Sequence, residues 1–351
     1  MHAGQVKNNI ANILMVVKQP LVSVIITTKN EEKNIENCLK SVKNQDYPED
    51  KIEIIVVDNN STDRTKEIAR KYTKKVYNFG PERSAQRNFG AKKAKGEYLL
   101  FLDADMILGP TVIGEVIKKF KFQSANWRTK SKINSKQYFS NFKHQISSTN
   151  IVALYIPEIV LGNSFWSKVR RFERSFYDGK VIDCVRVIRK DIFEKVGGFD
   201  TSLTGPEDWD FDKKVREQGK VAVLAKYNFE KINKKLRNLE IKKLSEIATE
   251  LVIYHNEAEF NLKKYLAKKL YYAKSFEKYI QKWGKEDLDI KKQFGFWYRY
   301  FGVFLENDKW KRFLRHPVLA AGVYFLRGLV GISYLISRIK ILTSFLKLYT
   351  I

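Results

Sequence analysis

GEYLLFLDAD (residues 96–105) combines a short apolar run with two carboxylates, Asp103 and Asp105, at its end. Two similar apolar runs precede it, LVSVIITT (21–28) and KIEIIVVD (51–58), and each is followed by a segment with helical spacing of apolar residues. Strands that alternate with helices predict a mostly parallel sheet with helices on both faces. The sequence therefore predicts an α/β fold.

Polar residues follow all three of these runs. They are Thr27, Thr28 and Asn30 after the first, Asp58 after the second, and Asp103 and Asp105 after the third. Because ligands of parallel sheets bind at the carboxyl ends of the strands, we expect these residues to converge on one crevice. Carboxylate oxygens suit Mg²⁺ or Mn²⁺ bridging phosphates. A helix N-cap followed by a turn is the more common explanation of an isolated Asp-x-Asp, but a cap needs one carboxylate and this strand end holds two beside Asp58.

Composition narrows the class of protein. The chain has 351 residues, of which 44% are hydrophobic, so disorder of the whole chain is excluded. A formal charge of +26 favours a partner that carries phosphate: nucleic acid, an anionic membrane or a phosphorylated small molecule. Cys38 and Cys184 stand alone, which argues against a disulfide framework or a structural zinc site.

Further motifs occur in a fixed order. They are TTKNE (27–31), VDNNSTD (57–63), AQRNFG (85–90), AKGEY (94–98), DAD (103–105), VGGFD (196–200) and Glu207-Asp208 within GPEDWD (205–210). This ordered set resembles glycosyltransferase family 2, from about residue 20 to residue 219. The resemblance implies a GT-A fold, in which a Rossmann-like sheet is covered by helices on both faces. It also implies a nucleotide-sugar donor, inversion at the anomeric carbon and a divalent metal, Mn²⁺ or Mg²⁺.

The resemblance also implies roles for the residues at the strand ends. Asp58 is expected to contact the base, Asp103 the ribose and metal, and Asp105 the metal as its main ligand. Other residues implied near the base, ribose or diphosphate are Thr27, Asn30, Glu31 and Arg87.

Asp208 is the candidate base. Inverting transfer requires an acceptor hydroxyl that loses its proton as it attacks, and a carboxylate opposite the leaving diphosphate can accept that proton. The resemblance implies that Asp208 accepts this proton and that Glu207 positions the acceptor or the base. Trp209 is a neighbouring candidate for contact with the acceptor. Acidic residues after Gly205-Pro206 also make a good helix start, and the two roles are compatible.

The leaving diphosphate needs positive charge, and Arg170, Arg174 and Arg186 are candidates. The segment VRRFERSF (169–176) is equally explained as a solvated helix face that contacts the membrane. Arg186 would be costly to bury unpaired, so we expect it to meet a carboxylate or a phosphate. His255, at the end of a strand, is either a structural hydrogen-bonding residue or, by resemblance, a group near the metal or diphosphate.

The chain divides into three parts. We expect a lead-in (1–19), a catalytic domain (20–257) and a helical C-terminal region (258–351). The catalytic domain would comprise a nucleotide-sugar half at about 20–120 and an acceptor half at about 150–257, with polar inserts at about 121–150 and 226–249.

The C-terminal region is rich in lysine and aromatic residues and contains VLAAGVYFLRGLVGISYLI (318–336). Helices of this kind either pack on a core or lie in a membrane interface, and the length of the apolar run favours the interface. With Arg327 at its centre, a helix lying in the leaflet is favoured over one that spans it. We therefore expect peripheral or monotopic attachment to an anionic membrane surface on the cytoplasmic side of the cell membrane.

The leading hypothesis is a glycosyltransferase that moves a sugar to a lipid-linked or saccharide acceptor. A basic nucleic-acid-binding protein would also explain the charge, but carboxylates at the strand ends would repel nucleic acid, so no specific nucleic acid is expected. A catalytically silent nucleotide-binding scaffold at the membrane is a further alternative. A nucleotidyltransferase usually has a glycine-rich loop after the first strand, and TTKNEEKN (27–34) contains no glycine.

Overall fold

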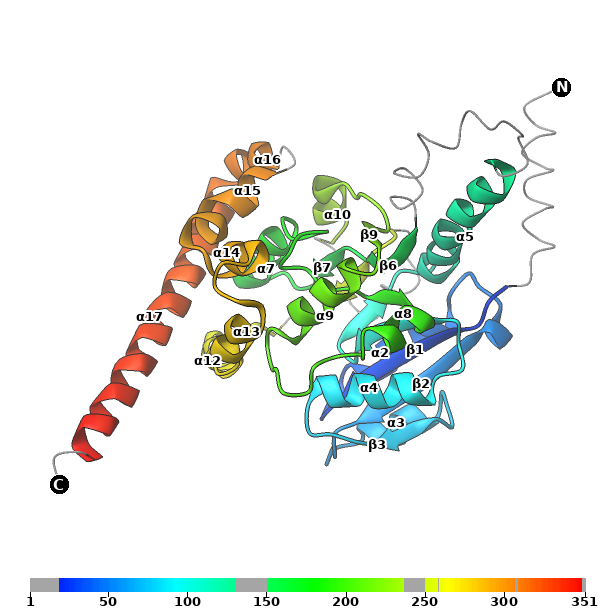
Figure 1. Ribbon diagram of the computed structural model, residues 1–351, viewed down its shortest axis with the longest axis horizontal. Coiled ribbons are helices and arrows are strands. Elements are labelled where there is room, and N and C mark those ends of the chain that lie inside the picture. The colour runs from blue at the N-terminus through cyan, green and yellow to red at the C-terminus, as the bar shows by residue number, and fades with distance from the viewer. Residues whose placement is uncertain (1–18, 131–149, 237–249, 258, 307–308, 349–351) are drawn as a thin grey trace.

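The computed structural model describes residues 19–130, 150–236, 250–257, 259–306 and 309–348, and their side chains outside 122–130 and 337–348 (Figure 1). The expected lead-in, apart from its last residue, lies outside the described residues. So do positions 131–149 and 237–249 of the two expected polar inserts.

A seven-stranded sheet forms the centre of the molecule, in the order β3-β2-β1-β4-β8-β6-β9 (Figure 1). Its strands are β1 (Val22–Thr28), β2 (Ile52–Asp58), β3 (Val76–Asn78), β4 (Tyr98–Asp103), β6 (Ile151–Tyr155), β8 (Val187–Arg189) and β9 (Lys220–Val223). β1 runs parallel to both β2 and β4, and β2 runs parallel to β3. β8 runs antiparallel to β4 and β6, while β6 and β9 are parallel. The expectation of a mostly parallel α/β sheet is confirmed.

Helices cover both faces because alternate residues of each buried strand point to opposite sides. Val24 and Ile26 belong to the core cluster that includes α2 (Ile35–Lys43), whereas Ile25 packs with α4 (Arg83–Lys93) on the other face. α4 lies very close to β1, since a Cβ at Gly90 would come 2.4 Å from the Ile25 side chain. The other helices of this part are α3 (Thr65–Arg70), α5 (Val112–Lys130), α8 (Lys190–Lys195) and α9 (Glu207–Arg216).

A three-stranded sheet, β5-β10-β7, stands beside the carboxyl edge of β4. β5 (Met106–Leu108) follows β4 directly, and it pairs antiparallel with β10 (Ile253–His255). β10 also pairs in parallel with β7 (Glu158–Val160). The pairing of His255 with Met106 brings a residue from late in the chain next to the Asp-x-Asp segment.

The C-terminal region forms a series of helices, with α17 along the side of the molecule away from the central sheet (Figure 1). Its elements are α12 (Leu262–Ala273), α13 (Phe276–Trp283), α14 (Leu288–Phe294), a π-helical turn (Tyr298–Gly302), α15 (Val303–Leu305), α16 (Trp310–Arg315) and α17 (Pro317–Leu348). α17 packs on α7 (Phe165–Arg174) and on α12. Among the described residues, one helical segment, Pro317–Ile336, is long and apolar enough to cross a membrane by length and composition.

Several segments differ from the expectations. The expected insert at 121–150 begins inside α5, which continues to Lys130. The insert at 226–249 begins with α10 (Phe229–Leu236), a helix whose Phe229, Ile232 and Leu236 are buried. These positions are amphipathic rather than uniformly solvated, because apolar residues three or four apart share one face of a helix.

The segment VIDCVRVI (181–188) forms a strand only from Val187 onward. The Asp183 carboxylate accepts hydrogen bonds from the backbone nitrogens of Gly179 (2.8 Å) and Cys184 (2.9 Å), so it holds this stretch in a turn. VRRFERSF (169–176) is likewise not a solvated face: Val169 and Phe172 are fully buried in the cluster that α17 completes.

Candidate active site

The site begins where β1 and β4 end side by side. Thr27 pairs with Asp103 in the parallel register, and the Thr27 hydroxyl donates to Asp103 Oδ1 at 2.8 Å. On the other side of β1, Thr28 pairs with Asp58. Four residues expected at one sheet edge therefore do lie at that edge.

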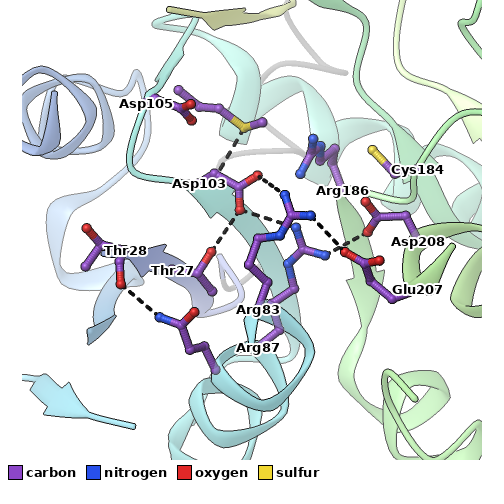
Figure 2. Close-up of polar contacts among 12 residues, drawn as sticks. Thr27, Thr28, Arg83, Arg87, Asp103, Asp105, Cys184, Arg186, Glu207 and Asp208 are labelled. Atoms are coloured by element: carbon purple, nitrogen blue, oxygen red, sulfur yellow. Dashed lines mark hydrogen bonds and ion pairs between the residues drawn. The ribbon is translucent and has the colours of Figure 1, made fainter. Parts of the chain in front are cut away.

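Arg87, on α4, joins this edge to α9. Its guanidinium is 1% exposed, and it donates to Asp208 Oδ1 at 2.7 Å and to Asp103 Oδ1 at 3.3 Å (Figure 2). It also lies 5.0 Å from the centre of the Phe199 ring. Burial alone would raise the pKa of Asp103, but the charges of the neighbouring arginines, Arg87 first, outweigh it and hold that pKa well below its usual range.

Arg83 makes a second bridge one helical turn earlier. It donates to Glu207 Oε1 at 3.0 Å and to the Tyr272 hydroxyl at 2.8 Å, and it lies 4.0 Å from Asp103. Glu207 is 1% exposed, and its second oxygen has no hydrogen-bond partner among the described residues. Burial, and then the charge of Asp208, raises the pKa of Glu207.

Arg83 and Tyr272 were absent from the sequence-based candidates. Arg83 had a detectable signal, because residues four apart on a helix lie on one face and Arg87 was already a candidate. Tyr272 had none, since its contact with Arg83 spans 189 positions.

Asp105 and His255 form a separate pair beside this network. Their Oδ2 and Nε2 atoms lie 3.0 Å apart, and Asp105 Oδ1 is buried without a partner among the described residues. Burial alone would lower the pKa of His255, but the charge of Asp105 outweighs it and raises that pKa to about 9.

The Asp105–His255 pair fits a divalent cation, because one carboxylate oxygen is free and imidazole is also a metal ligand. Across the described residues, however, no group of three His, Cys, Asp or Glu side chains is arranged to hold a metal. Asp103 is engaged by Thr27 and Arg87 instead. Further ligands would have to come from outside the described residues or from a shift of Asp103.

The remaining donor candidates shape the loops that follow β1 and β2. Asp58 is fully buried, and its two oxygens accept from the Ser61 nitrogen (2.8 Å) and hydroxyl (2.5 Å). Asn30 has a φ of 54° and accepts from the Thr62 nitrogen at 2.9 Å. Glu31 accepts from Asn34 at 2.7 Å, and burial is the main cause of its raised pKa. Asn30 therefore links the two loops, whereas the Asp58 and Glu31 carboxylates each accept from within their own loop.

The three candidate arginines are each paired with buried carboxylates. Arg186 contacts Glu158 at 2.5 Å, which is the carboxylate partner expected for it, and Arg174 contacts Glu158 at 3.1 Å. Arg170 contacts Glu173 at 2.6 Å. Arg186 lies nearest the catalytic candidates, beside Asp208 (Figure 2).

Trp209 lies in an aromatic cluster apart from the arginine bridges. Its ring is 5.9 Å from that of Phe294 and 6.4 Å from that of Phe276. It therefore packs α9 against the C-terminal helices.

A mostly parallel sheet with helices on both faces, carboxylates at the strand ends and a Glu-Asp pair opening α9 defines a GT-A type protein. Residues 23–197 match the family described as Glycosyl transferase family 2. The chain belongs to this family.

Curated relatives match parts of the chain. It is 45% identical over 93 residues to the glycosyltransferase AglE of Haloferax volcanii, a match that covers 24% of the chain and 31% of AglE. It is 27% identical over 214 residues to the GalNAc(5)-diNAcBac-PP-undecaprenol beta-1,3-glucosyltransferase of Campylobacter jejuni, covering 49% of the chain and 66% of that enzyme. The chain thus spans less than a third of AglE and about two thirds of the Campylobacter enzyme.

A solved structure, the mannosyltransferase PcManGT of Pyrobaculum calidifontis in complex with GDP-Man and Mn²⁺, superposes at a TM-score of 0.47 and 17% identity. The superposition covers 95% of the chain and 82% of that enzyme. The order of the strands in the central sheet and the family match define the fold.

Proposed function

We propose that the protein is an inverting, metal-dependent glycosyltransferase that moves a sugar from a nucleotide-diphosphate donor to a lipid-linked or saccharide acceptor at a membrane. The observation that carries this proposal is the Arg87 bridge, which connects Asp103 at the strand end with Asp208 at the start of α9. Donor-side and acceptor-side carboxylates thereby belong to one buried network.

Asp208 is suited to accept the acceptor proton. Its side chain is 24% exposed, whereas Glu207 beside it is nearly inaccessible. An acceptor hydroxyl can therefore reach Asp208 but not Glu207, which fits Asp208 as base and Glu207 as a positioning residue.

Arg83 and Arg87 have two effects on that base. They fix the orientation of the acidic pair, and their charges offset the repulsion between Glu207 and Asp208. They also surround Asp103 with positive charge, and the same charge would stabilise a diphosphate that develops negative charge as the glycosidic bond breaks.

The metal would be held by Asp105 and His255, with Asp103 as a candidate for a further ligand. When bound, Mn²⁺ or Mg²⁺ supplies Lewis-acid stabilisation of the diphosphate leaving group. The unpartnered Asp105 Oδ1 supports this assignment, because a buried carboxylate oxygen without a donor is costly unless a ligand satisfies it.

The membrane part of the proposal rests on exposed apolar side chains. Trp297 is 75% exposed, Leu335 62% and Ile332 54%, and aromatic residues beside lysines are typical of proteins at membrane interfaces. Arg327 does not interrupt this exposed apolar surface, since its side chain is buried and contacts Glu173 at 2.9 Å. This arrangement favours an α17 that lies on the surface of the membrane, which we propose to be the cytoplasmic one. The Campylobacter relative, named for a PP-undecaprenol-linked acceptor, supports a lipid-linked one.

Calorimetric titration with uridine, guanosine and thymidine diphosphates and their sugars tests the donor site, with Mn²⁺, with Mg²⁺ and with chelator. We expect metal-dependent binding of one nucleotide, which Asp105→Ala abolishes. Unchanged binding by that variant would remove Asp105 from the metal site. A folded protein that binds no nucleotide would contradict the enzyme proposal and favour a scaffold or a nucleic-acid-binding protein.

Sedimentation with anionic vesicles tests the membrane surface separately. Trp297→Ser and Leu335→Ser each remove an exposed side chain without opening the core, so we expect weaker sedimentation and an unchanged melting temperature. Equal sedimentation of both variants and the parent would place the membrane contact elsewhere.

A further inference from the structure

Four cationic side chains from separate elements gather where α12 meets α7 and α17. This cationic cluster consists of Arg170 on α7, Lys269 on α12, Arg299 in the π-helical turn and Arg327 on α17. Arg170 and Lys269 lie on the same Tyr265 ring, at 5.2 Å and 5.4 Å from its centre. Arg327 is tied to Arg170 through their shared partner, Glu173.

The cluster carries more positive charge than its surroundings neutralise. Two carboxylates meet it: Glu173 pairs with Arg170 and Arg327, and Glu257 pairs with Arg170. Among the described residues, Lys269 and Arg299 make no ion pair or side-chain hydrogen bond. Burial, and then the charges of Arg170 and Arg299, lowers the pKa of Lys269 to about 7.

Arg327 provides a second, independent sign of a missing anion. This residue is 8% exposed, and its Nη1 has no hydrogen-bond partner among the described residues. A buried guanidinium nitrogen without an acceptor costs free energy unless a ligand or an ordered water supplies one.

The surroundings of the cluster indicate what kind of anion would bind. Arg299 lies between Trp297 and Phe301, which are 75% and 42% exposed, and the Phe301 ring is 6.3 Å from Tyr324 on α17. Phe325 on α17 is 53% exposed. Positive charge bordered by exposed aromatic and aliphatic side chains matches a lipid with a charged head and an apolar chain.

The cluster is also connected to the candidate metal site. Arg170 donates to Glu257 at 3.2 Å, and Glu257 follows two residues after His255. A head group held at the cluster would therefore sit on the side of the active site that faces α17.

We propose that the cationic cluster binds the phosphate or diphosphate head of a membrane lipid whose apolar chain lies along α17. This inference rests on the proposed function, because it makes the acceptor a lipid-phosphate-linked sugar. Lys269 and Arg299, which have no carboxylate partner among the described residues, would pair with the phosphate. Arg327 Nη1 would donate a further hydrogen bond to it.

Vesicle flotation of the full chain tests this proposal. The probes are phosphatidylcholine vesicles alone, the same vesicles with a polyprenyl diphosphate, and vesicles with phosphatidylserine at equal charge. We expect the parent to bind the polyprenyl diphosphate vesicles most tightly. Lys269→Gln combined with Arg299→Gln should weaken that binding by roughly tenfold or more, since hydrogen bonds to charged groups are individually strong.

Lys263→Gln is the matched control, because Lys263 lies on the same helix, is exposed and has no ion pair among the described residues. It removes one charge from α12 and should leave the binding unchanged. Soluble pyrophosphate distinguishes a free anion from a lipid head, and we expect it to compete poorly.

Three results would overturn the proposal: equal binding by the double variant, equal binding to phosphatidylserine vesicles, or full competition by soluble pyrophosphate. Nucleotide calorimetry on the same double variant separates the two proposals. Retained donor binding with no lipid selectivity in the parent would refute only the lipid-head site. Lipid selectivity without donor binding would instead refute the proposed function.

Discussion

Arg87 holds Asp208 and Asp103 on one guanidinium, at 2.7 Å and 3.3 Å respectively. One carboxylate comes from the end of a central strand and the other from the first turn of α9, 105 positions later in the chain. The proposed base and the proposed donor-side carboxylate are thus fixed relative to each other before any ligand binds. The arginine is the only part of this bridge that is almost completely buried.

Arg87→Met should destabilise the fold, because it leaves Asp103 and Asp208 without their shared cation. Removing one partner of a buried ion pair costs about 3–5 kcal/mol. Since both carboxylates here are partly exposed, we expect the lower end of that range. Chemical denaturation measures this loss of stability.

Arg87→Lys keeps the charge but cannot contact both carboxylates in the same way, so it should recover most of the stability and little of the activity. Full activity in Arg87→Lys would contradict a positioning role.

Asp208→Asn tests the base directly. The amide keeps the shape of the side chain but cannot accept a proton, so turnover should fall by about 10²–10⁴-fold while donor affinity stays within a factor of a few. Steady-state kinetics and nucleotide calorimetry on the same preparation separate these effects. Substantial turnover in this variant would remove Asp208 from the role of base.

Asp178 predicts a pH dependence of stability away from the active site. Burial raises its pKa to about 6, with Asp183 adding to the shift and Lys309 and Arg174 opposing it. Because the pKa of Asp178 is higher in the folded chain than in the unfolded chain, the protonated carboxyl stabilises the fold. This stabilisation is complete below the unfolded pKa near 4 and is lost as the pH rises through about 6. Asp178→Asn should therefore gain stability relative to the parent between pH 5 and pH 7, by up to about 3 kcal/mol. Urea denaturation across this range measures the difference, and parallel curves would refute the shift.

Local patterns in the sequence were sufficient for the central sheet. β1, β2 and β4 are short apolar runs with polar ends, and parallel pairing then places Thr27 beside Asp103 without further information. The Asp105–His255 contact was less accessible to sequence reasoning, because it depends on the pairing of β5 with β10 across 150 positions. The family resemblance places His255 near the metal or the diphosphate. Its position at the end of a strand does not by itself predict that role.

Contacts of the C-terminal helices with α9 carried no local signal at all. Lys213 contacts Asp287 at 2.5 Å, and Trp283 donates to the buried Asp210 at 2.9 Å. Lysine-rich amphipathic segments predict an exposed face, but not which neighbour covers the other face. The C-terminal region expected from 258 onward therefore packs directly on α9 through residues within 262–294.

Tyr272→Phe tests whether this packing matters for catalysis. Tyr272 accepts a hydrogen bond from Arg83 at 2.8 Å, and Arg83 in turn donates to Glu207 at 3.0 Å. The hydroxyl therefore helps to orient the Glu207-Asp208 pair. Loss of one such hydrogen bond costs about 1 kcal/mol, which corresponds to roughly a fivefold fall in turnover. Donor affinity should change little, because the substitution keeps the charge of Arg83 and leaves the contacts of Arg87 and Thr27 with Asp103 in place. Tyr271→Phe is the matched control, since the neighbouring hydroxyl contacts Glu82 at the surface and touches no catalytic candidate. An equal loss in both variants would indicate a general effect on α12. A loss confined to Tyr272→Phe would establish that the C-terminal region completes the active site.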